Sequence, residues 1–180
     1  ADQATGRTVE SSGTGADDGD IYITGLGAGV AYDFTAVASE SGTEKAEFSN
    51  SDVTLDSGAS LGTVELVITN ANTATISEAQ ADGRATSGTG NLTVLAIATD
   101  TDLSNVASSG TVIANIASSG DYSANTNLGN VDNFTINGDR SVDLSVAMSA
   151  KSITLGVRST VTAKLASDGS DADIRAITFD

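Results

Sequence analysis

The chain has no cysteine, histidine, proline or tryptophan. Without cysteine it can build neither a disulfide framework nor a thiolate metal site. Without histidine and cysteine it lacks the commonest general base and the thiolate nucleophile, so we expect no enzymatic activity. The absence of proline favours fully paired β-ladders, which have little room for a residue without an N–H group.

Basic and aromatic residues are also scarce. Eight Lys and Arg face 24 Asp and Glu, which gives a net charge of −16. The basic residues are scattered, whereas nucleic-acid binding needs clustered ones, and the acidity disfavours an anionic membrane surface. No run is apolar enough to span a bilayer, so we expect no membrane insertion. With three Tyr and four Phe, the predicted core consists mainly of Val, Ile, Leu and Ala.

The sequence repeats itself about every 70 residues. Residues 32–43 resemble residues 101–111, and a shorter copy covers residues 173–177. The aligned aspartates Asp33, Asp102 and Asp173 are 69 and 71 residues apart, and Asn70 returns as Asn137 after 67. Such periodicity predicts stacked units that contact mainly their neighbours. We therefore expect one elongated repeat domain over residues 1–180, with internal repeats at roughly 1–78, 79–147 and, in part, 148–180.

Apolar residues alternate with polar ones at a period of two, which indicates strands rather than helices. Turn-forming Gly, Asn, Asp and Ser separate the runs. The predicted inward residues are Ile21, Ile23, Val64, Leu66, Ile68, Leu92, Val94, Ala96, Val112, Ala114, Ile116, Val142, Leu144, Val146, Val161 and Ala163. Only residues 76–82 read as helical, and we expect a turn or a single helical turn there.

Glycines that open the strand blocks give the length of one structural unit. Gly62, Gly90, Gly110 and Gly129 are separated by 28, 20 and 19 residues. A rung of about 20 residues accommodates two or three short strands and their corners, as one turn of a β-solenoid requires. The predicted fold is all-β: a parallel β-helix-like β-solenoid. The alternative is a tandem series of antiparallel β-sandwiches, which also have short strands and frequent turns.

Aspartates suggest two roles. Asp33, Asp102 and Asp173, with Asn70 and Asn137, are predicted at repeat corners, where such side chains bond nearby backbone N–H groups. A row of ion ligands is the other interpretation of the repeated aspartates.

Two acidic loops are candidate calcium sites. One holds Asp17, Asp18 and Asp20, and the other holds Asp168, Asp171 and Asp173. Calcium takes six to eight oxygen ligands, so closely spaced carboxylates suit it. Neither loop has the distal Glu of the helix-flanked calcium loop, and ordinary Asp/Gly turns also explain both. Calcium is the one cofactor that the sequence suggests.

The segments at residues 80–84, 90–94 and 102–106 resemble β-strand repeats of very large bacterial surface and secreted proteins, including adhesins, S-layer-like proteins and filament components. The resemblance implies an extracellular or cell-surface structural role, and it assigns no functional residue. We expect self-assembly into a fibre or surface layer, through end-to-end strand pairing and calcium, with other copies or neighbouring repeats as partners. The alternative is an adhesin or glycan-binding module excised from a larger repeat protein, for which Tyr22 and Tyr32 are the candidate aromatic contacts.

Overall fold

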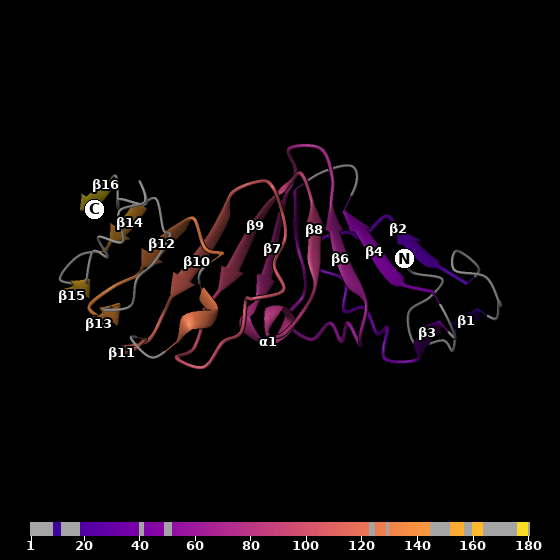
Figure 1. Cartoon of the computed structure of the whole chain (residues 1–180), viewed down its shortest axis with the longest axis horizontal. Coiled ribbons are helices and arrows are strands. Elements are labelled where there is room, and N and C mark those ends of the chain that lie inside the picture. Colours follow the sequence, from indigo (N-terminus) through magenta and orange to yellow (C-terminus); the bar gives the residue numbers. More distant parts are fainter. Residues whose placement is uncertain are drawn as a thin grey trace. The chain divides into compact units, whose positions relative to one another are not determined.

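The computed structural model describes residues 9–11, 19–39, 42–48, 52–122, 125–128, 130–144, 152–156, 160–163 and 176–179. These residues are almost entirely strands and turns (Figure 1). The chain divides into two compact units: residues 1–76, 84–92 and 105–110 form the first, and residues 77–83, 93–104 and 111–180 form the second. Among the described residues, no helix has the length and apolar character that a membrane span requires.

Every strand pair of the first unit is parallel. The strands β2 (Ile21–Thr24), β4 (Glu44–Phe48), β6 (Glu65–Ile68) and β8 (Thr86–Gly88) form one sheet in that order. β5 (Val53–Thr54) pairs with β7 (Thr73–Ser77), and β1 (Val9–Ser11) pairs with β3 (Val37–Ser39).

The second unit repeats this parallel arrangement. One sheet contains β10 (Val112–Ile116), β12 (Asn133–Ile136), β14 (Ser152–Leu155) and β16 (Ala176–Phe179). Another contains β11 (Gly120–Asp121), β13 (Ser141–Leu144) and β15 (Thr160–Ala163). The unit also holds the helix α1 (Glu78–Ala81) and a 3-10 turn (Thr126–Leu128), and β9 (Asn91–Leu95) spans the boundary between the units.

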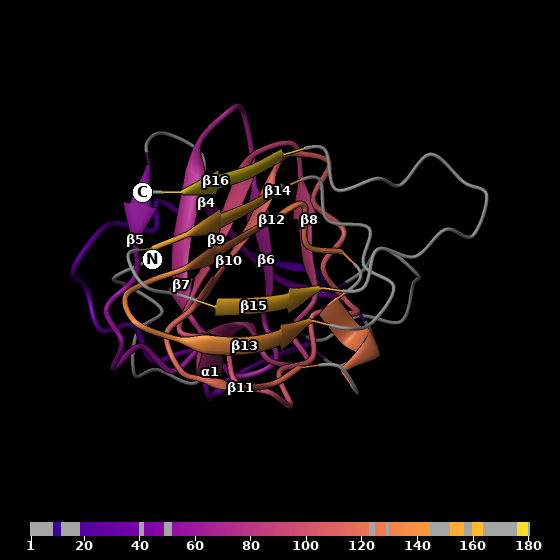
Figure 2. The same ribbon diagram turned by 90° about the vertical axis from the view of Figure 1, so that its left-hand side faces the viewer.

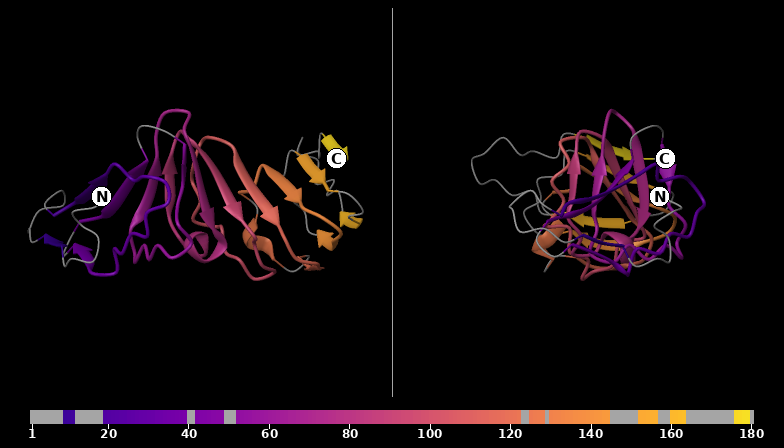
Figure 3. Two further views of the ribbon diagram at one scale, coloured as in Figure 1. Left: turned by 180° about the vertical axis from the view of Figure 1, so that it is seen from behind. Right: turned by 90° about the vertical axis from the view of Figure 1, so that its right-hand side faces the viewer.

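The strand register confirms the solenoid prediction. Lys45 pairs with Glu65, Leu66 with Thr86, and Ile113 with Asn133, each 20 residues further on. Neighbouring strands of one sheet thus belong to successive coils, which can be followed from two sides in Figure 3. The tandem antiparallel sandwich is wrong, because every described strand pair is parallel and parallel strands need a long crossover instead of a hairpin.

Inward side chains stack in rows from coil to coil. Ile23, Ala46 and Leu66 occupy one row of the first unit, and Ile116, Ile136 and Leu155 occupy one row of the second. Burying each large aliphatic or aromatic side chain contributes about 1.5–3 kcal/mol. The core contains more aromatic residues than we expected from their scarcity: Tyr32, Phe34, Phe48, Tyr122 and Phe134 are all fully buried. A chain with few rings thus places most of them inside.

Two of the four strand-opening glycines share a corner on successive coils. A Cβ on Gly110 would lie 2.1 Å from the carbonyl oxygen of Gly90, so that corner accepts no side chain. Gly62 lies elsewhere, at φ +56 beside the backbone of Phe34, and Gly129 is outside the described residues. The glycine spacing indicated the coil length correctly although its members do not all occupy one position.

The alternating pattern fails at Ala96. We expected its side chain to point inward, but β9 ends at Leu95, and Ala96 is exposed with φ +58. A left-handed residue cannot continue a strand.

The expected helical turn is confirmed as α1, where the Gln80 side chain accepts a hydrogen bond from the backbone N–H of Ser77 at 3.0 Å.

The glycine corner gives a stability test. Gly110→Ala should lower the free energy of unfolding by about 1–3 kcal/mol, because its methyl group would collide with the Gly90 carbonyl. The matched control is Gly27→Ala, whose methyl group would meet only the Tyr32 hydroxyl at 3.5 Å and should cost nothing. Urea denaturation followed by circular dichroism measures both, and equal effects would contradict the stacked corner.

Candidate functional site

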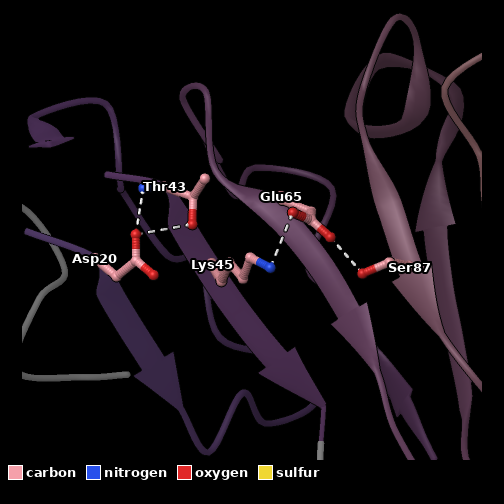
Figure 4. A network of polar contacts seen from close by, with 5 residues as sticks. All are labelled: Asp20, Thr43, Lys45, Glu65 and Ser87. Carbon is pink, nitrogen blue, oxygen red and sulfur yellow. Dashed lines mark hydrogen bonds and ion pairs between the residues drawn. The ribbon is translucent and has the colours of Figure 1, made fainter. Parts of the chain in front are cut away.

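The outer face of the β2-β4-β6-β8 sheet carries the best-defined cluster of polar side chains. Tyr22 pairs with Lys45, and Lys45 with Glu65, so these residues lie in one row across three coils. Their side chains point outward because Ile21, Ile23, Ala46 and Leu66 occupy the alternating inward positions. We call Asp20, Tyr22, Thr43, Lys45, Glu65 and Ser87 the polar face; all but Tyr22 are drawn in Figure 4.

Contacts on the polar face run from one coil to the next. Lys45 Nζ lies 3.6 Å from Glu65 Oε2, and the hydroxyl of Ser87 donates to Glu65 Oε1 (Figure 4). Asp20 Oδ1 accepts from the backbone N–H of Thr43 at 2.7 Å and from its hydroxyl at 3.2 Å. Partly exposed ion pairs contribute little to the free energy of unfolding. These contacts therefore orient the side chains on the surface, whereas the stability of the fold comes from the core.

The two tyrosines have different environments. Tyr22 is 61% exposed on the polar face, so it could contact a ligand. Tyr32 is 2% exposed, stacks on Phe34 at a centroid distance of 5.4 Å, and accepts a hydrogen bond from the Gly27 N–H. Packing thus accounts for Tyr32 and leaves Tyr22 as the exposed aromatic residue.

Most of the candidate calcium ligands lie outside the described residues: Asp17, Asp18, Asp168, Asp171 and Asp173. Asp20 is described, and one of its carboxylate oxygens accepts both Thr43 hydrogen bonds. In the described ranges, no three His, Cys, Asp or Glu residues gather closely enough to hold a metal ion. The calcium sites therefore stay a prediction.

Asp33 and Asp102 each accept a hydrogen bond from the residue two positions further on. Asp33 Oδ1 bonds the hydroxyl of Thr35 at 2.6 Å and its N–H at 3.1 Å, and Asp102 Oδ1 bonds the N–H of Ser104 at 2.9 Å. These bonds favour the charged carboxylate. The pKa values of both aspartates therefore lie below the ordinary 3.8, chiefly through the Thr35 and Ser104 side chains and then through their backbone N–H groups.

Other aspartates connect neighbouring coils. Asp52 accepts from the N–H of Thr73, Asp82 from that of Asp102, and Asp132 from that of Val112, at 2.7, 2.7 and 2.8 Å. The donor and the acceptor are about one coil apart in each case. A carboxylate at a corner thus satisfies a backbone donor of the adjacent coil.

Asn70 and Asn137 each lie just after a strand, and the two strands belong to different sheets. Asn70 is exposed just after β6, with the left-handed φ of 57 that asparagine tolerates. Asn137 is exposed just after β12, and its N–H donates to the carbonyl of Ile116. The 67-residue offset therefore relates two strand ends that do not belong to one ladder.

The polar face is absent from the sequence-based predictions. Its signal was available: writing the chain in steps of about one coil, as repeat sequences invite, places Lys45 beside Glu65. The 70-residue repeat does not bring these two residues together, because they are only 20 positions apart.

Comparison with known proteins gives no match: no protein-family model, curated protein or solved structure is significantly similar to this chain. The resemblance to bacterial surface repeats therefore stays a prediction from the sequence.

The low pKa values define a pH test. A carboxyl group with a lowered pKa in the folded state stabilises that state above its unfolded pKa, and this contribution disappears as the pH falls through the folded value. We expect the carboxyl carbons of Asp33 and Asp102 to titrate below pH 3.8 in a ¹³C NMR titration. Thr35→Val should raise the midpoint of Asp33 and leave that of Asp102 unchanged. Ordinary midpoints for both in the native chain would contradict the corner bonds.

Proposed function

We propose that this protein is a non-enzymatic structural protein of the cell surface or extracellular medium, and that its solenoid self-assembles end to end into a fibre or layer. The parallel ladder supports this role. A stack of coils leaves backbone N–H and C=O groups at its edges, which recruit further strands unless something covers them. In the described part of the chain, β16 pairs on one side only, with β14.

The non-enzymatic part of the proposal rests on composition. The chain has no histidine or cysteine to serve as base or nucleophile. The location outside the cell rests on the resemblance to bacterial surface repeats. Calcium enters as the ion that would offset the repulsion between copies that each carry a net charge of −16.

Negative-stain electron microscopy tests the assembly. We expect fibres or sheets from the purified chain in calcium, and their loss on addition of a chelator. Aspartate-to-asparagine changes at Asp17, Asp18 and Asp20 should then abolish the calcium effect, whereas Asp56→Asn, a matched change at a turn, should not. Discrete particles at high concentration with and without calcium would rule out self-assembly by this chain.

The exposed Tyr22 favours a second candidate function, glycan binding. Tyr22 shares its outer row with the amine of Lys45 and the carboxylate of Glu65, so its ring could stack on a sugar while these groups bond the sugar hydroxyls. This function would make the chain an adhesive module.

A binding assay distinguishes the two functions. We expect Tyr22→Ala to lower retention on an insoluble polysaccharide at least about fivefold if one such contact anchors the sugar, since loss of an aromatic anchor costs more than about 1 kcal/mol. Thr24→Ala, two residues along on the same face, is the control, and both variants should melt like the native chain. Equal retention of native chain and Tyr22→Ala would exclude Tyr22 as an anchor.

A further inference from the structure

Three described strands of the second unit, β10, β12 and β14, present an outer face on which no residue is charged. The outward residues on β10, β12 and β14 are Ile113, Asn115, Asn133, Thr135, Ser152 and Thr154, which we call the charge-free face. All six are half-buried, while the alternating residues of each strand fill the core. The six side chains of this face thus contribute nothing to the net charge of −16.

The side chains of this face stand in two straight rows. One row joins Ile113, Asn133 and Ser152, and the other joins Asn115, Thr135 and Thr154. Strands in a sheet are about 4.7–4.9 Å apart, so both rows repeat at that spacing. Within the first row, the Ser152 hydroxyl donates to Asn133 Oδ1 at 2.6 Å. Figure 2 shows β10, β12 and β14 side by side.

The other sheet of the same unit differs in charge. Asp121 and Asp143 are register partners on β11 and β13, so two carboxylates are neighbours on its outer side. The second unit thus separates a carboxylate-bearing face from the charge-free face. If two copies met through their carboxylate-bearing faces, the like charges would repel one another. Contact through the charge-free face avoids this repulsion.

We propose that the charge-free face docks against the same face of a second copy of this chain. This inference rests on the proposed self-assembly and adds a lateral contact to it. Rows of short Asn, Thr and Ser side chains at strand spacing interdigitate when two such sheets stack, as in a steric zipper. A second copy has the same strand spacing, so its rows can lie against these rows along their length, and its own face also carries no charge that would be buried unpaired. The contact is isologous, so each copy contributes the same residues.

Thr135 lies in the middle of one row and is the residue to change. Thr135→Glu places a carboxylate opposite the same face of the partner. Ser141→Glu is the matched control: it adds the same charge to the same unit, at an exposed position on the neighbouring sheet. Sedimentation over a concentration series, without calcium, measures association, and circular dichroism melting verifies that both variants fold.

We expect the native chain to form a reversible dimer, Thr135→Glu to weaken it at least about tenfold, and Ser141→Glu to change it less than about twofold. Because the chain has no cysteine, Thr135→Cys also supplies a single thiol. A short bis-maleimide should link two Thr135→Cys chains far faster than two Ser141→Cys chains.

The outcomes separate this inference from the proposed function. Dimers without fibres would support the lateral contact and contradict end-to-end assembly. Fibres whose association and cross-linking ignore Thr135 would support the proposed function and overturn the lateral contact. A native chain that stays monomeric would overturn the contact, and loss of polysaccharide retention in Thr135→Glu would then assign the face to a glycan.

Discussion

In the described part of the chain, successive coils are held together by backbone hydrogen bonds between parallel strands, and that ladder fixes which side chains point outward and which point inward. Because the pairing is parallel and keeps a register of about one coil, residues some 20 positions apart become neighbours. The same register stacks Ala46 on Leu66 inside and Lys45 on Glu65 outside. A shift by one residue would exchange the two faces, so burial of the aliphatic rows keeps the polar rows in order.

The acidic character of the chain has a structural explanation in part. Asp33 and Asp102 cap their own turns, and Asp52, Asp82 and Asp132 accept backbone hydrogens across coils. Carboxylates suit these corners because an ionised acceptor makes stronger hydrogen bonds than a neutral one. The basic residue Arg84 also bonds the backbone of another coil: its guanidinium donates to the carbonyls of Val64 and Gly62 at 2.7 and 3.1 Å. Partial burial lowers the pKa of its guanidinium, which remains charged at neutral pH.

Solenoids present flat faces whose chemistry is set independently, because each face draws on a different segment of every coil. The polar face has an ion pair and an exposed ring, whereas the charge-free face has only short uncharged side chains. One architecture can therefore combine different surfaces: we propose a lateral contact through the second unit and, as the second candidate function, ligand binding through the first. Assembly through strand edges uses neither face, since it depends on backbone groups alone.

The sequence by itself determined the strand content, the inward residues of most strands, the length of a coil and a turn or helical turn within residues 76–82, because period-two alternation and turn residues are local signals. It misassigned Ala96, since no local signal marks a left-handed alanine. The 70-residue repeat predicted equivalent positions for Asn70 and Asn137, but the two residues follow strands of different sheets. The tertiary structure decided between the parallel solenoid that the sequence favoured and the antiparallel sandwich, and it alone decided which tyrosine is buried and which outward side chains share a row. Those properties depend on the register between coils, and register arises from packing of residues far apart in the chain.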